Sequence, residues 1–572
     1  MQLQLDQKVN VMVITASFIL GVAAEFPWLR VSLAPEFNSS NNAVIALDMT
    51  LQLNDPNNLK AGQPLLKFDL NHGETPTLRY DNDALSAADD NGVLSLSHTD
   101  SNDTNVQRTW SASRDSVGEI VVRFRAEPRE TNSSTPSGPR IDLRNDQGGV
   151  IGMAEGFIPY PPGDREWNVT VHWNIPEPAP ADIRFASSLG DQQNSSTIGT
   201  PSRILAKSYF AIGLLQRWPP WNVSASYHTT QAMERDFALY WIGSLPYNPN
   251  RVGGIIEEMF LSISEFFGDY ESPFRVFWRY VWTGYGGAGG YQSFLLERSD
   301  GTEEELSEDA LTNLVSHETI HEYALMYPTR QYNLWHREGV ANYYAVMAPF
   351  YGGALDRQSF IRWLNNNAQA YYTSSTLGLD WQYIVEHYWE GLDIVKSPYN
   401  RGFIYLAYVQ GLVSAATNEE KSLDDIVLEL YRRFIAGEKC QTEEFVEVLG
   451  NIIGKDPAEK SFSQMKNGTL IVPPTNSLAK FGLKMVRRDA ERFEPGFVVS
   501  SNRVTSLVKG SRAEEAGLEE GDQVVSTWAL WGAGDSLDNM MQFVIVRDGQ
   551  EHVIKYWPRS YEKVENWMWV EG

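Results

Sequence analysis

The chain has 572 residues, 42% of them hydrophobic, and carries 73 acidic against 47 basic residues, for a net charge of −26. That apolar content supports three or four domains with their own cores and excludes a disordered chain. The negative charge excludes a surface that seeks phosphate, so we expect no nucleic-acid partner. The single cysteine, Cys440, excludes a disulfide framework and a cysteine-based zinc site, so metal ligands must come from His, Asp or Glu.

The N-terminal residues 1–24 are a possible signal peptide. Residues 9–24 read VNVMVITASFILGVAA and end in small residues that suit a cleavage site. The run is too short for a stable membrane span, and a first buried strand is the alternative interpretation. Sequons for N-glycosylation favour a secreted glycoprotein over the cytoplasmic alternative; they lie at Asn38, Asn102, Asn132, Asn168, Asn194, Asn222 and Asn467.

Residues 25–205 predict an all-β domain. Apolar and polar residues alternate in NAVIALDMTLQL, GEIVVRFRAE and EWNVTVHWNIP, and clusters of Gly, Pro, Asn and Ser separate these runs. We expect a sheet that is antiparallel, and nothing in this part indicates chemistry.

Residues 206–478 predict a second domain that is rich in helices. An amphipathic segment from Gly253 to Asp269 is followed by a strand-like segment, SPFRVFWRYVWTG. Next comes YGGAGGYQSFLLERSDG, which we interpret as a glycine-rich turn that leads into a strand, because a lone glycine cluster usually marks a tight turn or an edge-strand bend.

A helix with clear start and stop signals follows. Ser307 is a suitable N-cap, Glu308 and Asp309 stand in the first turn, and Pro328 ends the run. Apolar residues recur within it at helical spacing, namely Leu311, Leu314, Val315 and Leu325. We therefore predict one helix that contains residues 317–321.

This helix carries an HExxH motif formed by His317, Glu318 and His321. Residues four apart lie on one face of a helix, so both imidazoles can bind the same zinc ion while Glu318 stays beside the open coordination position. Zinc lowers the pKa of bound water towards roughly 7, and Glu318 would act as general base. An accidental match on an ordinary amphipathic helix is the alternative.

Catalytic zinc sites have three protein ligands, and Glu338 is the candidate for the third. It lies in LWHREGVANYY, a second helix-like segment after a short connection that contains proline. The pattern predicts one zinc ion per chain in a two-His, one-Glu site with an open fourth position. In a zinc peptidase the strand before the metal helix can form the edge on which substrate lies, which makes Gly289 and Gly290 candidate substrate-binding residues.

Five more helices are predicted before a linker, MKNGTLIVPPTNS, closes the domain near residue 478. Their segments are DRQSFIRWLNNNAQAYY, LDWQYIVEHYWEGL, YNRGFIYLAYVQGLVSAATN, SLDDIVLELYRRFIAG and TEEFVEVLGNII. A strand-and-zinc-helix half followed by an α-rich half is the layout of thermolysin-like catalytic domains.

Residues 479–562 resemble a PDZ domain. The stretch GSRAEEAGLEEGDQVV, from Gly510 to Val525, is similar to the GSxAxxAGLxxGDxI-type segment of that domain. The resemblance implies that Phe481, Gly482 and Leu483 form a loop whose N–H groups bind a peptide carboxylate. A PDZ-shaped packing module that contacts only its own chain is the alternative.

An all-β domain, an HExxH domain and a PDZ-like domain in this order resemble the glycyl aminopeptidase family of zinc metallopeptidases, in the gluzincin clan. HETIH, LWHREGVANYY and PYNRGFIYLAYV carry the resemblance. It implies a multidomain α+β protein that releases small N-terminal residues such as Gly or Ala from peptides. It also implies that Tyr399, in a Tyr-Asn-Arg-Gly sequence similar to YxKG, stabilises the oxyanion, with a core tyrosine as the alternative.

The chain departs from this family in two places. The segment between the second histidine and Glu338 is shorter, and GGAGGYQSFLLERS lacks the Glu-His pair whose acidic residue would hold a substrate's free amine. Glu297 is the only nearby carboxylate and is therefore the candidate for this substrate-binding role. A zinc endopeptidase therefore stays open as an alternative, as does a weakly catalytic PDZ-bearing protein that binds peptides.

Overall fold

The computed structural model describes most of the chain, namely residues 26–55, 59–72, 75–102, 106–132, 141–221, 236–244, 248–282, 285–299, 308–326, 331–388, 390–500, 502–525 and 532–572. The possible signal peptide, the sequon at Asn222, and the predicted cap Ser307 and stop Pro328 lie outside these residues. Within them, no helix combines the length and the hydropathy needed to cross a membrane.

The N-terminal part is a β domain, as predicted, and its largest sheet has seven strands in the order β15-β13-β1-β2-β10-β6-β7. The strands are β1 (Trp28–Phe37), β2 (Val44–Asn54), β6 (Ser86–Asp89), β7 (Gly92–Val93), β10 (Ile120–Ala126), β13 (Trp167–Trp173) and β15 (Asn194–Gly199). Buried and exposed residues alternate along β10 and β13, which explains the alternation of apolar and polar residues in their sequences. The sheet is not wholly antiparallel, because β1 pairs with β13 in parallel.

Two smaller sheets complete this domain. One contains β3 (Pro64–Asp69), β9 (Gln107–Ala112) and β8 (Leu96–Asp100); the other contains β11 (Arg144–Asp146), β12 (Gly149–Met153), β16 (Tyr209–Gly213) and β14 (Arg184–Ser187). Short pieces lie between them, β4 (Asn71–His72), β5 (Thr75–Pro76) and α1 (Pro201–Ile204). Because β16 pairs within this domain, the chain leaves it after Gly213 and not at the expected residue 205.

The second domain begins with a mixed five-stranded sheet in the order β17-β18-β19-β21-β20. Its strands are β17 (Leu215–Trp218), β18 (Phe237–Ile242), β19 (Phe274–Tyr280), β20 (Tyr285–Gly290) and β21 (Ser293–Arg298). The glycine-rich segment was expected to be a turn, but it forms β20, an edge strand antiparallel to β21. The turn falls at Tyr291 and Gln292, where Gln292 has a φ of 47°.

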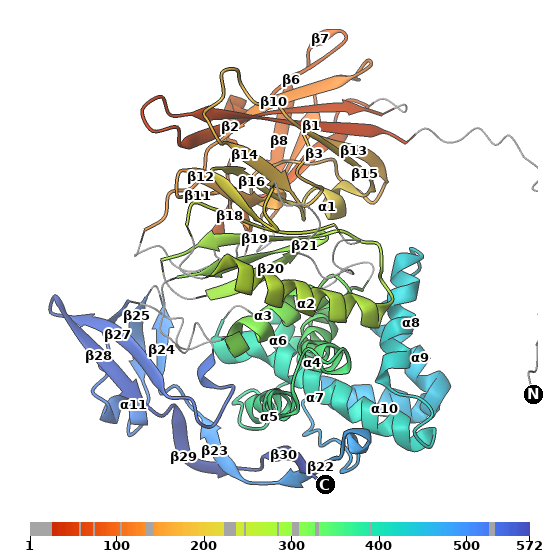
Figure 1. Cartoon of the computed structure of the whole chain (residues 1–572), viewed down its shortest axis with the longest axis vertical. Helices are drawn as coiled ribbons and strands as arrows, with labels where there is room; N and C mark the ends of the chain where they lie inside the picture. Colours follow the sequence, from red (N-terminus) through yellow and green to blue (C-terminus); the bar gives the residue numbers. More distant parts are fainter. Residues whose placement is uncertain are drawn as a thin grey trace, which may run out of the picture.

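Helices cover the face of this sheet that is turned away from the N-terminal domain (Figure 1). They are α2 (Pro249–Phe267), α3 (Glu308–Ile320), α4 (Leu334–Tyr351), α5 (Arg357–Tyr372), α6 (Trp381–Glu386), α7 (Leu392–Ala416), α8 (Leu423–Ile435), α9 (Thr442–Ile453) and α10 (Lys455–Lys466). The helical prediction is confirmed for this half, although α6 is shorter than expected and α10 was not predicted. α4 and α7 pack against each other at the centre of the largest hydrophobic core.

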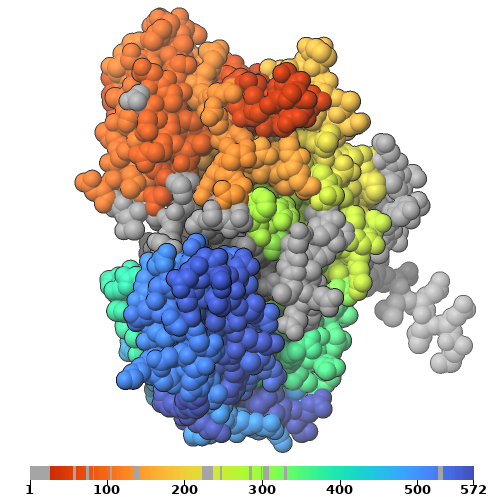
Figure 2. All heavy atoms as spheres, turned by 90° about the vertical axis from the view of Figure 1, so that its left-hand side faces the viewer, coloured from red at the N-terminus to blue at the C-terminus, as the bar shows by residue number. Residues whose placement is uncertain are grey.

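The C-terminal part has its own small core around a five-stranded sheet, β24-β25-β26-β27-β28. The strands are β24 (Phe497–Ser500), β25 (Arg503–Leu507), β26 (Gln523–Val524), β27 (Met541–Arg547) and β28 (Gln550–Tyr556), with α11 (Arg512–Glu515) between β25 and β26. Two hairpin-like pairs connect it to the helices, β22 (Leu483–Arg487) with β30 (Trp567–Glu571), and β23 (Ala490–Phe493) with β29 (Arg559–Val564). On the face seen in Figure 2, this part and the N-terminal domain lie at opposite ends of the molecule.

The expected peptide loop of the PDZ-like part does not have the predicted role. The ring of Phe481 packs against Phe350 and Phe360 of the neighbouring helices. The N–H groups of Gly482 and Leu483 donate to carbonyl groups of residues 478 and 479. These donors are already used within the chain, so the loop cannot offer them to a peptide carboxylate.

Candidate active site

The two histidines of the HExxH motif lie side by side at the end of α3. His317 stands in the last turn of α3, and His321 is the first residue after its final residue, Ile320. The helix is shorter than predicted, because residues 321–323 form a turn in which Glu322 and Tyr323 donate to carbonyl groups three residues back. The Nε2 atoms of His317 and His321 are nevertheless only 3.1 Å apart.

Glu338 on α4 completes a triangle with these histidines. Its Oε2 atom lies 3.5 Å from Nε2 of His317 and 3.3 Å from Nε2 of His321. The three side chains could together hold a metal ion, and Glu338 is buried with its Oε2 lacking a hydrogen-bond partner in the described structure.

These spacings fit zinc. Tetrahedral ligands at zinc distances of 2.0–2.1 Å stand about 3.3 Å from one another, and the three measured separations of 3.1, 3.3 and 3.5 Å bracket that value. An orphaned carboxylate oxygen facing two imidazole nitrogens is what a metal position requires. The donor set of two nitrogens and one oxygen, all from described residues, therefore fits zinc.

The three groups also influence one another's protonation. Burial alone would raise the pKa of Glu338, but the positive charge of His321 and the close approach of both imidazoles hold that pKa well below its ordinary value. Burial likewise opposes the charged form of His317, yet Glu338 and Glu318 raise its pKa. Glu338 is therefore a carboxylate at neutral pH, which is the form that binds a metal.

Two asparagine side chains, hydrogen-bonded in series, orient His317. Asn342, one turn after Glu338 on α4, hydrogen-bonds His317 and contributes to the raised pKa of that histidine. The Nδ2 group of Asn342 donates to Oδ1 of Asn367 at 2.8 Å, and Asn367 in turn donates to the carbonyl of Trp363 at 3.0 Å. Such outer partners fix the ring orientation of a metal-binding histidine.

Glu318, the expected base, lies against the glycine strand. A Cβ added to Gly287 would stand 2.4 Å from Cγ of Glu318, and one added to Gly289 would stand 3.2 Å from Cβ of His321. Only glycine allows β20 to approach α3 this closely. Gly289, a predicted substrate-binding residue, thus packs against His321, and the strand's backbone borders Glu318.

The N-terminal domain and the metal helix both hold β20 in place. The hydroxyl group of Tyr209 donates to the carbonyl of Ala288 at 2.8 Å, and the N–H group of Gln292 donates to Glu322 at 3.0 Å. A Cβ on Gly290 would meet the carbonyl of Lys207 at 2.7 Å. Gly290 is therefore packed against the N-terminal domain, and its small size serves this contact.

The close crossing of α4 and α7 brings Tyr399 to the site. A Cβ on Gly339 would lie 2.6 Å from Cα of Gly402, and a Cβ on Gly402 would lie 2.1 Å from the carbonyl oxygen of Trp335. The two glycines thus let the helices touch through their backbones. As a result, the ring of Tyr399 stacks on His317, with centroids 5.7 Å apart and an interplanar angle of 17°.

Tyr388 is a site residue that the sequence did not reveal. It is buried just before α7 and hydrogen-bonds Tyr399, while burial raises its pKa to a value far above neutrality. Burial and the nearby Glu338 likewise raise the pKa of Tyr399 well above its ordinary value. Both phenols therefore keep their protons at neutral pH and can act as donors. No motif distinguishes Tyr388 within its aromatic-rich segment.

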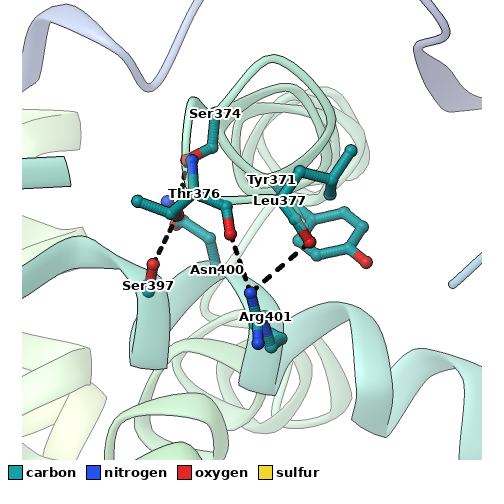
Figure 3. A pocket seen from close by; sticks show the side chains of 7 residues that line it. All are labelled: Tyr371, Ser374, Thr376, Leu377, Ser397, Asn400 and Arg401. Atoms are coloured by element: carbon teal, nitrogen blue, oxygen red, sulfur yellow. Dashed lines mark hydrogen bonds between the residues drawn. The ribbon is translucent and has the colours of Figure 1, made fainter. Parts of the chain in front are cut away.

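Arg401 takes the position of the lysine in the YxKG-like motif and has a structural role. Its Nη1 group donates to the carbonyl of Leu379 and its Nη2 group to that of Thr376, both at 2.8 Å. Figure 3 shows the contact with Thr376 beside a cavity of about 10 Å³, which is room for a single water molecule. Arg401 therefore fixes the loop after α5 against α7, and this cavity is too small for substrate.

Glu297, the expected anchor for a substrate amine, cannot serve in that role. Its neighbours on β21, Phe294 and Leu296, face α2 and α3, whereas Glu297 faces the N-terminal domain. There it is 4% exposed and accepts a hydrogen bond of 2.9 Å from Nε of Arg279. Side chains alternate between the two faces of a strand, and Glu297 falls on the face away from the metal ligands.

Comparison with known proteins supports the fold. No family model matches the chain, and no curated protein matches it in sequence. A solved aminopeptidase N family protein from Idiomarina loihiensis has a TM-score of 0.62 at 12% identity, over 95% of this chain and 98% of that chain. This likeness shows a shared fold from the β domain to the C-terminal part.

Two further solved structures resemble a smaller share of the chain. An M1 zinc metallopeptidase from Deinococcus radiodurans has a TM-score of 0.49 at 16% identity, over 78% of this chain and 94% of that one. Native yeast LTA4 hydrolase has a TM-score of 0.48 at 12% identity, over 79% of this chain and 70% of that one.

Proposed function

We propose that the protein is a zinc-dependent peptidase. The observation that carries this proposal is the triangle of His317, His321 and Glu338, with Glu318 beside it and a protonated tyrosine stacked on one ligand. A closed structural zinc site would have a fourth protein ligand and no use for a carboxylate held next to the open position.

Each residue has a distinct task in this proposal. His317, His321 and Glu338 would hold zinc, which acts as a Lewis acid on water and on the scissile carbonyl. Glu318 would accept the proton from the attacking water and deliver it to the leaving amine. Tyr399 would donate a hydrogen bond to the oxyanion, supported by its contact with Tyr388. The backbone of β20, beside Gly287, would align an extended peptide.

Release of small N-terminal residues, such as Gly or Ala, is the specific reaction we propose first. The solved structure that shares this fold over nearly its whole length is titled an aminopeptidase N family protein.

Cleavage that needs no free amine is a second candidate, favoured by one observation. Glu297 lies on the far face of the sheet, and the described residues of β20 carry no charged side chain. Among the described residues of β20 and β21, a free ammonium group would find no carboxylate on the side of the metal ligands. An endopeptidase would not require this contact.

Metal analysis and a matched set of peptides test both candidates. The protein should bind about one zinc ion and hydrolyse Gly- or Ala-aminoacyl reporters or short peptides. Peptides with a free and an acetylated N-terminus then separate the reactions, because hydrolysis of the acetylated form excludes an obligatory free amine. A protein that binds no zinc, or that binds zinc and cleaves no peptide, would contradict the proposal.

A further inference from the structure

Arg337 is a cation inside the candidate active site whose role the proposed mechanism leaves open. It directly precedes Glu338 on α4, and its Nε lies 3.5 Å from Oε1 of that ligand. Its charge also acts on Glu318, Tyr388 and Tyr399. The guanidinium therefore stands among the groups that would surround the reacting bond.

Arg337 has unused hydrogen-bonding capacity. Its side chain is 49% exposed, although the metal ligands nearby are almost completely buried. Apart from the ion pair with Glu338, the described part of the chain offers it no hydrogen-bond acceptor. A guanidinium has five N–H donors in a planar arrangement that matches a carboxylate. Arg337 can therefore bind a ligand without giving up an internal hydrogen bond.

The charge balance of the site favours an anionic ligand. With a divalent zinc ion, the positive charges are those of zinc and Arg337, and the negative charges are those of Glu338 and Glu318. Zinc contributes two of the three positive charges, so the site has a net charge of about +1 before substrate binds. A carboxylate would neutralise this excess, whereas an ammonium group would add to it.

Strand β20 brings no compensating negative charge to the site. The residues of β20 are Tyr, Gly and Ala, and Glu297 on the next strand is paired with Arg279 on the other face of the sheet. On the side of the metal ligands, β20 and β21 therefore contribute no carboxylate. This is a local exception in a chain with a net charge of −26.

We propose that Arg337 determines specificity by binding a carboxylate of the peptide substrate close to the scissile bond. The proposal rests on the zinc-peptidase function above and names its substrate class. Two sources supply the same chemistry, an Asp or Glu side chain next to the cleaved bond, or the C-terminal carboxylate of a short peptide.

Two matched peptide pairs test this proposal on the zinc-loaded full chain. One pair exchanges Glu for Gln beside the cleaved bond, and the other exchanges a C-terminal carboxylate for a carboxamide. In the wild type we expect kcat/KM to favour the carboxylate member of one pair by roughly 10- to 100-fold. The pair that shows the preference identifies the source.

Variants at Arg337 separate specificity from other roles. Arg337→Met should lower hydrolysis of the carboxylate member much more than hydrolysis of the neutral member, with zinc still bound, while Arg337→Lys should keep part of the preference. Arg432→Met, which removes an exposed arginine on α8, is the matched control and should behave like the wild type. In the Glu318→Gln background, calorimetry with the same peptides should show the same preference in affinity.

Several outcomes would overturn the proposal. If Arg337→Met lowers kcat/KM equally for both members of each pair, Arg337 positions Glu338 or acts on the oxyanion. If the wild type hydrolyses both members of each pair equally well, Arg337 binds no substrate carboxylate. In both cases neutral peptides are still cleaved, and the zinc-peptidase function stands. A protein that holds no zinc or cleaves no peptide would overturn that function and this inference together.

Discussion

Gly287 lies so close to Glu318 that a Cβ at residue 287 would stand 2.4 Å from Cγ of the glutamate. We therefore predict that Gly287→Ala displaces the general base and lowers kcat by at least about tenfold, with zinc content unchanged. Gly254→Ala is the control, because a Cβ on Gly254 of α2 would meet nothing within 4 Å. Hydrolysis by Gly287→Ala at the wild-type rate would contradict the assigned contact.

Tyr399 provides a second test, because its phenol keeps its proton at neutral pH and faces the site. We predict that Tyr399→Phe lowers kcat by roughly 10²- to 10³-fold, the usual effect of removing one oxyanion donor. KM and zinc content should change little. Tyr383→Phe, at a half-exposed tyrosine of α6, should have no effect. A Tyr399→Phe variant with full activity would make this residue a packing tyrosine.

The C-terminal strand β30 belongs to the core of the helical domain. Trp569 is fully buried there. Its backbone N–H group donates to Oδ1 of Asn365 at 2.8 Å, and its backbone carbonyl accepts from Nδ2 of Asn365 at 2.9 Å. Trp569→Ala should lower the free energy of unfolding by about 3–5 kcal/mol. Thermal unfolding of this variant should show early loss of the helical domain. Val553→Ala on the exposed side of β28 should be neutral.

Glu257 predicts a pH-dependent stability that is independent of the active site. Burial on α2 raises its pKa to about 7 from 4.5. Its charged form is disfavoured only in the folded state, so the free energy of unfolding should decrease as pH rises from about 4.5 to 7 and level off above 7.

We therefore predict that Glu257→Gln stabilises the protein increasingly over that range, by up to about 3 kcal/mol above pH 7. The measurement is the difference in Tm between variant and wild type at pH 5, 6, 7 and 8. Glu265→Gln, on an exposed position of the same helix, should give a difference near zero at every pH. A constant Tm difference for Glu257→Gln would show that its carboxyl group does not titrate in this window.

Local signals were sufficient to predict the cluster of His317, His321 and Glu338, and a β-rich part followed by a helix-rich part. HExxH spacing places His317 and His321 on one helix face, and the Glu-Gly sequence at residue 338 indicates a second helix that can pack closely. Alternation of apolar and polar residues likewise predicted strands in residues 25–205, and helical spacing of apolar residues predicted most helices after Glu338. In each case, the feature depends on residues that are neighbours in sequence.

The residues whose roles were predicted wrongly or missed owe their positions to contacts between segments that are far apart in the sequence. Glu297 is turned away by the register of β21, and that register is set by pairing with β19 and β20. Phe481 resembles a PDZ loop residue in sequence, but its environment is supplied by α4 and α5. Tyr388 belongs to the site because α4 and α7 cross at Gly339 and Gly402, which brings its partner Tyr399 to His317.

The most direct test of the zinc-peptidase function compares the wild type with Glu318→Gln. Both proteins are measured for bound zinc and for hydrolysis of the best reporter peptide, in equal buffer and after removal and return of zinc. We predict about one zinc ion per chain in both, and a rate for Glu318→Gln that is lower by at least about 10³-fold. The proposed function would be contradicted if the wild type and Glu318→Gln both bind zinc and hydrolyse the peptide at equal rates, or if the wild type binds no zinc.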